Sequence, residues 1–136
     1  MKKLEKGNID ISRLNVLPEK HEYATARYFA DRGYDVIFIR PSSIRGQNSA
    51  DFEMGGRIWE TKGPVKYSKA SFEDNTRKAV RQSEHIIFDL RRLSEKDESS
   101  YMKKLEGRGK ARKIKTLLII ARDGRLLTLK GEFSII

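Results

Sequence analysis

Residues 50–63, ADFEMGGRIWETKG, decide the fold that we expect for this chain. Two short strand-like runs flank Gly55-Gly56, and a glycine pair between such runs is typical of a two-residue β-hairpin turn. Counting outward from that turn places Phe52 opposite Trp59. Because side chains alternate between the two faces of a strand, this pair is expected to face the core. A slip of one residue would exchange the faces, so the prediction depends on a tight turn.

The same register places Asp51 opposite Glu60, with Lys62 on the same face. Two carboxylates in opposed positions lie about 4.5–5.5 Å apart at Cβ and repel each other. A divalent cation would compensate that repulsion, and a lysine beside it could orient water or support negative charge. The three residues therefore indicate a site for metal-assisted phosphodiester hydrolysis. The alternative is an exposed hairpin with one salt bridge, since Glu-x-Lys occurs by chance in most charged proteins.

The rest of the chain predicts an α/β domain with a mixed sheet flanked by helices. Pro18 and Gly33 bracket the first helix, and Ser71 with Asp74 resembles a capping box at the start of the second. The final hairpin has Asp123-Gly124 as its expected two-residue turn. The expected elements are helices at 18–33 and 71–85, strands at 36–39, 50–54, 57–62 and 86–90, a short helix within 94–112, and a hairpin at 113–131.

Length and composition favour one domain without a membrane helix. The 136 residues suffice for a single core, divided into an N-terminal extension (1–17), a catalytic core (18–92) and a C-terminal hairpin (113–131). No apolar run approaches the roughly 18 residues that span a bilayer. Cysteine is absent and histidine occurs twice, so Mg²⁺ or Mn²⁺ held by oxygen ligands is favoured over zinc.

The charge predicts a polyanionic partner. Lysine and arginine number 29 against 19 acidic residues, a formal net charge of +10. The basic residues gather in residues 103–115 and on the second expected helix, at Arg77, Lys78 and Arg81. Such clusters favour a nucleic acid, although a run of charge is often only a solvated face.

Glu22 also belongs to the candidate site. It lies four residues before Ala26 and seven before Phe29, so it projects towards the apolar face of the first helix. A carboxylate at the edge of a buried stripe is costly unless something pairs with it.

Glu22 on an opening helix, Asp51 before a glycine turn and Glu60-Thr61-Lys62 on the returning strand together resemble the PD-(D/E)xK nuclease superfamily. Ala50 stands where the name-giving motif has proline. The stretches HEYATARYFADRGYDVIFIRPSS, SADFEMGGRIWETKGP and KAVRQSEHIIFDL are similar to the C-terminal tRNA-nuclease domains of contact-dependent growth inhibition toxins. This resemblance covers about residues 20–91 and implies a restriction-endonuclease-like fold.

The resemblance also implies roles. Asp51 and Glu60 would be metal ligands, Lys62 the catalytic lysine, and Glu22 a further ligand or a base. The nucleic acid would be contacted by residues of the second helix and of the loop after the first strand: Arg77, Lys78, Arg81, Gln82 and Ser42. His21 is interpreted as a surface or helix-start histidine rather than a ligand, and Trp59 as a core residue. Thr61 is interpreted as structural, with a hydroxyl next to the site as its alternative.

The function that this resemblance implies is a metal-dependent tRNA endonuclease of toxin type. Such a toxin would act in the cytoplasm, be delivered as part of a larger secreted protein and be neutralised by an acidic immunity protein. Two alternatives remain. The same residues resemble DNA nucleases and junction resolvases of mobile elements, which the start at Met1 would suit and some of which dimerise. A non-catalytic nucleic-acid-binding module is the third hypothesis.

Overall fold

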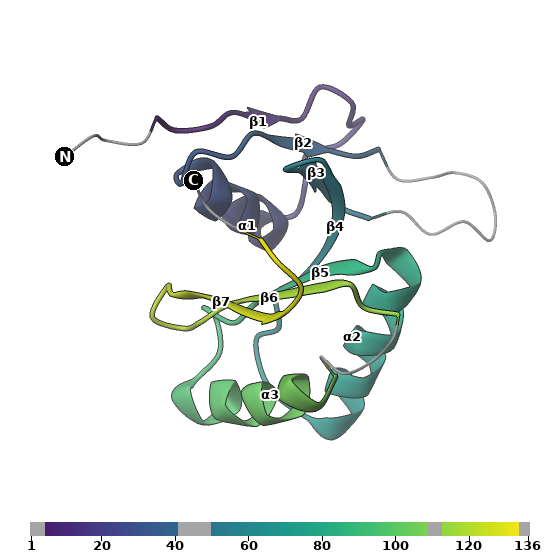
Figure 1. The fold of residues 1–136 in the computed structure, drawn as a ribbon, viewed down its shortest axis with the longest axis vertical. Coiled ribbons are helices and arrows are strands. Elements are labelled where there is room, and N and C mark those ends of the chain that lie inside the picture. The colour runs from purple at the N-terminus through teal and green to yellow at the C-terminus, as the bar shows by residue number, and fades with distance from the viewer. Residues whose placement is uncertain (1–4, 41–49, 109–112, 134–136) are drawn as a thin grey trace.

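The structure is a computed structural model that describes residues 5–40, 50–108 and 113–133, and these residues form one seven-stranded sheet with three helices (Figure 1). The strands lie in the sheet in the order of the chain. They are β1 (Ile9–Asp10), β2 (Val36–Phe38), β3 (Phe52–Met54), β4 (Arg57–Lys62), β5 (His85–Asp89), β6 (Thr116–Ile120) and β7 (Leu126–Lys130). The helices are α1 (Lys20–Ala30), α2 (Lys69–Gln82) and α3 (Glu95–Arg108).

The sheet is mixed, as expected. The pairs β1–β2, β4–β5 and β5–β6 are parallel, and the pairs β2–β3, β3–β4 and β6–β7 are antiparallel. The predicted α/β class with a mixed sheet flanked by helices is therefore confirmed. None of the helices within the described ranges is long and apolar enough to cross a membrane.

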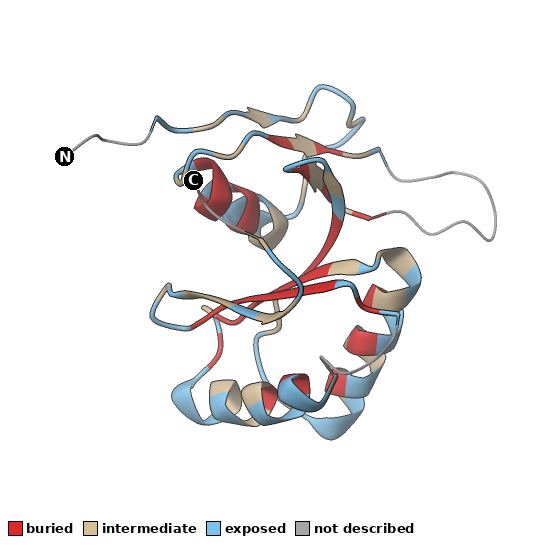
Figure 2. Cartoon of the chain, viewed as in Figure 1, coloured by how far each residue is buried: buried red, intermediate tan, exposed pale blue. Residues whose placement is uncertain are grey.

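The helices cover both faces of the sheet, with α1 on one side and α2 and α3 on the other (Figure 1). The side chains of β6, which alternate between the two faces of the sheet, show that each face has its own core. Leu118 and Ile120 pack in the core beneath α1, whereas Leu117 and Ile119 pack in the core beneath α2 and α3. Figure 2 shows β5 and β6 as mostly buried strands, as expected for parallel strands covered on both faces.

The β3–β4 hairpin has the predicted register. Phe52 pairs with Trp59, and both side chains are fully buried. The Trp59 indole also donates a 2.9 Å hydrogen bond to the Met54 carbonyl. Gly55 and Gly56 have φ of 59° and 76°, so both occupy the left-handed region that a type I′ turn requires. The hairpin that carries the candidate site therefore has the tight two-residue turn that the predicted register requires.

Several predicted boundaries were wrong. α1 is shorter than the helix expected at 18–33, α2 ends at Gln82 rather than at residue 85, and β5 begins at His85 rather than at residue 86. α2 begins earlier than expected, because Ser68 is its N-cap and its side chain accepts a 3.1 Å hydrogen bond from the Ser71 backbone. The β6–β7 loop has three residues rather than two, since Ile120 pairs with Leu126 and Ala121 donates to the Arg125 carbonyl. Gly124 at its end has φ 91°, which suits a three-residue loop with a bulge.

The buried carboxylate of Asp89 links α1 to the end of β5 through hydrogen bonds. The Asp89 carboxylate accepts a 2.7 Å hydrogen bond from the Thr25 hydroxyl of α1 and 2.7 and 2.9 Å hydrogen bonds from Arg91. Burial alone would raise the pKa of Asp89, but these hydrogen bonds outweigh it and hold the pKa below its ordinary value. Since Glu22 lies one turn before Thr25, this contact also sets where Glu22 projects.

Candidate active site

A cleft of about 510 Å³ lies between the start of α1, strand β4 and helix α2. The three carboxylates and the lysine predicted from the sequence all line it, although they come from separate elements. Glu22 is on α1, Asp51 directly precedes β3, and Glu60 and Lys62 are on β4. The remaining lining residues are Glu19, His21, Thr61, Gly63, Pro64, Val65, Lys66, Ser71, Asn75 and Gln82.

Asp51 is held by Thr61 of the neighbouring strand. The backbone amide and the hydroxyl of Thr61 each donate a 2.8 Å hydrogen bond to Asp51 Oδ2. The Asp51 amide in turn donates to the Trp59 carbonyl at 2.9 Å, so the ladder of the hairpin continues to Asp51. Thr61 thus corresponds to the alternative in which its hydroxyl lies next to the site, since that hydroxyl contacts a candidate ligand and the residue lines the cleft.

Glu60 is the most deeply buried acid of the cleft, with 2% of its surface exposed. Its Oε2 lies 3.0 Å from Lys62 Nζ and, with the amide nitrogen of Gln82 turned towards it, also accepts from that side chain. Its Oε1 has no hydrogen-bond partner within the described part of the chain. Burial, followed by the charge and hydrogen bond of Asp51, raises the pKa of Glu60 to about 8. The cleft thus contains a buried carboxylate whose negative charge, when ionised, is not fully compensated by nearby positive charge.

Glu22 is half-buried, and its pKa is raised for similar reasons. Burial first, and then the negative charges of Asp51 and Glu19, raise the pKa of Glu22 to about 7. Lys62 opposes this rise but does not cancel it. Burial and the negative charge of Asp51 thus raise the pKa of both Glu60 and Glu22, and a divalent cation in the cleft would relieve this electrostatic cost.

The residues predicted on α2 divide into two groups. Gln82 lines the cleft and lies against Glu60. Lys78 is exposed and pairs with Asp74 of the same helix at 3.0 Å, as Arg77 does at 2.7 Å. Arg81 lines a separate hollow on the other side of Gln82. Ser42, the last predicted contact residue, lies outside the described residues.

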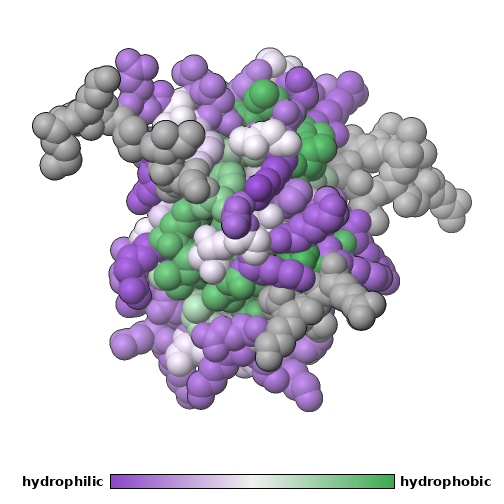
Figure 3. All heavy atoms as spheres, viewed as in Figure 1, coloured by the Kyte–Doolittle hydropathy of each residue, from purple (hydrophilic) through white to green (hydrophobic). Residues whose placement is uncertain are grey.

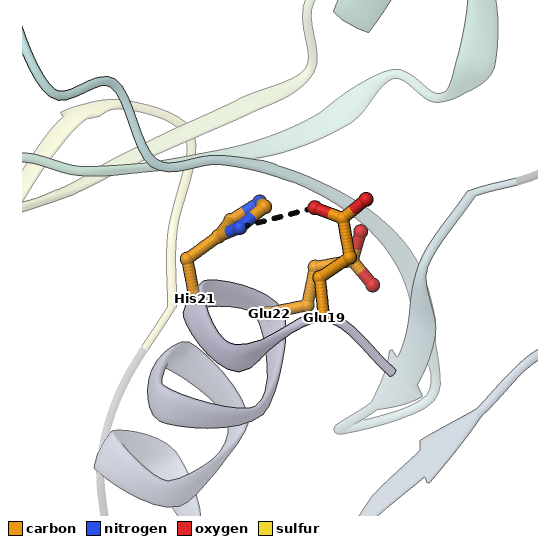
Figure 4. Close-up of side chains that lie close together, drawn as sticks. All are labelled: Glu19, His21 and Glu22. Atoms are coloured by element: carbon orange, nitrogen blue, oxygen red, sulfur yellow. Dashed lines mark ion pairs between the residues drawn. The ribbon is translucent and has the colours of Figure 1, made fainter. Parts of the chain in front are cut away.

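His21 and Glu19 add a feature that the sequence interpretation did not anticipate. Together with Glu22 they gather at the start of α1, each with a ligand atom within 4.8 Å of the others (Figure 4). His21 Nδ1 lies 3.3 Å from Glu19 Oε2. His21 is therefore at the start of a helix, as interpreted, and it also lines the cleft. Of these residues only Glu19 and Glu22, three positions apart, have a spacing that brings side chains together on a helix, so the spacing alone did not indicate His21.

Residues 48–126 match the family model described as the contact-dependent growth inhibition CdiA C-terminal domain, and they make up more than half of the chain. The chain belongs to this family. The family identifies it as a toxin domain of contact-dependent growth inhibition. Within this CdiA C-terminal domain the matched segment contains Asp51, Glu60 and Lys62, whereas Glu22 precedes it.

A solved structure shares the fold of this CdiA C-terminal domain. It is a CdiA-CT/CdiI toxin and immunity complex from Burkholderia pseudomallei, matched with a TM-score of 0.63 and 16% sequence identity over 92% of this chain and 100% of that chain. At that identity the likeness shows the fold alone. A search of curated proteins gave no match.

Proposed function

We propose that this toxin domain is a metal-dependent nuclease of the PD-(D/E)xK type that hydrolyses RNA. The observation that carries the proposal is the meeting of Glu22, Asp51, Glu60 and Lys62 in one cleft from separate elements. A chance Glu-x-Lys on an exposed hairpin would leave these side chains in solvent. Here Glu60 is buried and Asp51 is fixed by two hydrogen bonds.

The side chains fit a divalent cation. Glu60 Oε1 is buried without a partner in the described residues, and Glu60 and Glu22 have raised pKa values. Asp51 and Glu60 would hold the ion, with Glu22 as a further ligand. Oxygen ligands of this kind suit Mg²⁺ or Mn²⁺. When bound, such an ion lowers the pKa of its water and stabilises charge on a phosphate.

The other groups have roles that follow from their positions. Lys62 lies beside Glu60, so its ammonium can donate to the attacking water or to a phosphate oxygen. Thr61 fixes the direction of the Asp51 carboxylate. Gln82 packs its amide against Glu60 from α2 and limits the freedom of that carboxylate. Each of these contacts keeps the cleft preorganised, which reduces the cost of binding the reacting groups.

We propose tRNA as the substrate, because the resemblance to tRNA-nuclease toxin domains implies it and the net charge of +10 suits a polyanion. Polar and charged side chains cover much of the face in Figure 3, around a hydrophobic band over β6 and β7. Arg81 of α2 lines a hollow that shares Gln82 with the cleft, and the basic residues of this helix would contact phosphates. DNA is the alternative substrate that the assay below includes.

We also propose an acidic immunity protein as the partner of this domain. The matched solved structure is a toxin and immunity complex, and a basic domain favours an acidic partner electrostatically. The proposed delivery as part of a larger secreted protein, and action on tRNA in the cytoplasm of the recipient cell, follow from the same resemblance.

The deciding experiment is a cleavage assay with tRNA, duplex DNA and branched DNA, in magnesium, in manganese and in chelator. Asp51→Asn and Glu60→Gln are expected to remove cleavage, and Lys62→Met to reduce it by at least about a hundredfold. Glu53→Gln is the matched control, because Glu53 lies on the same hairpin but outside the cleft. Full activity in chelator would refute the metal-dependent mechanism. Calorimetry that detects no metal binding would instead favour the non-catalytic module.

A further inference from the structure

A second hollow, of about 440 Å³, opens beside the cleft (here called the apolar pocket). Its walls include Val16, Leu17 and Pro18 from the segment before α1 and Phe38 and Arg40 from the end of β2. Its volume falls within the range of about 300–1,000 Å³ that is common for ligand pockets.

The apolar pocket is continuous with the candidate active site. Glu19, Glu22 and Asp51 line both the cleft and the pocket, so one wall is shared. A group seated in the pocket therefore lies directly beside the carboxylates at which a phosphate would react. A base and the phosphate of its own or the next nucleotide lie close enough together to occupy the pocket and the cleft at the same time.

The pocket suits a flat, uncharged group rather than an anion. Val16 and Leu17 are 77% and 79% exposed, which is unusual for two adjacent large aliphatic side chains. The pocket's own lining offers a phosphate one cation, Arg40, whereas the metal that would attract a phosphate is proposed for the neighbouring cleft. A nucleobase has apolar faces that aliphatic side chains can contact and a polar edge that Arg40 could bind.

We propose that the apolar pocket binds one unstacked nucleobase of the strand whose phosphate lies at the carboxylate cleft, an inference that rests on the proposed nuclease function. A base within a continuous duplex is stacked on both faces and cannot enter without being flipped out. The favoured substrate class is therefore a nucleotide in a single strand, a loop or an end. The pocket would supply positioning and specificity, and the cleft would supply the chemistry.

The test compares the wild-type domain with the double variant Val16→Ser/Leu17→Ser. Both positions are exposed, so the fold should tolerate the change, which circular dichroism and thermal melting would check. Ile58→Ser is the matched control, because Ile58 is 51% exposed and lines neither the cleft nor the pocket. Binding is measured by fluorescence anisotropy with calcium as the metal. The probes are 12-nucleotide RNA strands, an abasic strand of the same length, and the corresponding duplex.

The wild type and Ile58→Ser are expected to bind the intact strand about fivefold or more tightly than the abasic strand and the duplex. The double variant should lose this preference and keep its affinity for the abasic strand. Equal binding of intact and abasic strands by the wild type would overturn the proposal. A double variant that binds strands as the wild type does, but binds a cognate immunity protein more weakly, would assign the surface to a protein instead.

Failure of the pocket and failure of the nuclease are distinguishable. If the wild type cleaves nucleic acid with magnesium but the double variant has unchanged affinity, KM and kcat, only the pocket proposal falls. If the wild type neither binds nor cleaves any strand with any metal, both proposals fall.

Discussion

Thr61 donates two hydrogen bonds to the same oxygen of Asp51, one from its backbone amide and one from its hydroxyl, each at 2.8 Å. The two residues lie on adjacent strands of the hairpin, and Thr61 is 4% exposed. A carboxylate held in this way has one oxygen committed to the protein. The hydrogen bonds from Thr61 fix the direction of this carboxylate at the cleft, and a metal ligand oriented in this way binds its ion more tightly.

Replacing Thr61 by valine is therefore expected to weaken the site rather than the fold. Valine keeps the shape and the backbone hydrogen bond but loses the hydroxyl, so metal affinity should fall by about 10–100-fold. Thr61→Ser keeps the hydroxyl and should restore most of that affinity. Calorimetric titration with Mn²⁺ measures the effect. If valine and serine variants bind Mn²⁺ equally, Thr61 does not position Asp51.

The charge of Glu60 is expected to cost stability when no metal is bound. Glu60→Gln removes one of the four carboxylates that line the cleft, and it should raise the melting temperature in chelator by about 3–5 °C. Adding Mn²⁺ should raise the melting temperature of the wild type and have little effect on the variant. Thermal melting with and without Mn²⁺ measures both changes. A variant that melts below the wild type in chelator would show that Glu60 stabilises the empty site.

The contact of Asp89 with Thr25 and Arg91 is expected to be structural. Asp89→Asn should destabilise the domain by about 2–3 kcal/mol at pH 7, because charge-assisted hydrogen bonds to a buried carboxylate are lost. Asp123→Asn is the matched control, since Asp123 forms the same kind of pair with Arg125 two residues away, but both side chains are exposed. That variant should leave the unfolding midpoint close to that of the wild type. Urea unfolding measures both.

The pH dependence of the Asp89 contribution follows from the direction of its shift. The pKa of Asp89 in the folded chain lies below its ordinary value, so ionised Asp89 stabilises the fold. The stability difference between wild type and Asp89→Asn should therefore be full above about pH 4, the unfolded value, and should shrink as the pH falls through the lower folded value. A difference that grows on acidification would contradict the assignment.

The turn of the hairpin should tolerate only residues that accept a positive φ. Gly56 has φ 76° and open space around its Cα, so backbone strain alone decides the effect of a substitution there. Gly56→Ala is expected to cost about 1 kcal/mol, and Gly56→Asn less, because asparagine enters the left-handed region more readily. Urea unfolding of the three proteins gives the order. Equal stability of the alanine and glycine forms would show that the turn relaxes.

Much of the hairpin could be predicted from the sequence because its rules are local. A glycine pair sets the turn, and the alternation of side chains then sets the register of Phe52 with Trp59. Glu60 and Lys62 share a face for the same reason. The boundaries of the other elements were predicted less well. Ser68 rather than Ser71 caps α2, and the β6–β7 loop has one residue more than predicted. Competing caps and turns differ by only about 1 kcal/mol, which short patterns do not resolve.

The sequence by itself determined the residue types of the site, its net charge and the hairpin that carries Asp51, Glu60 and Lys62. Only the tertiary structure decided that Thr61 holds Asp51, that His21 and Glu19 join the cleft wall, and that an apolar pocket opens beside it. The hydrogen bond from Thr25 of α1 to Asp89, 64 residues away in the chain, also depends on the tertiary structure. Turn propensity and side-chain periodicity act between near neighbours in the chain, whereas burial, electrostatic fields and hydrogen bonds between elements depend on which distant segments are packed together.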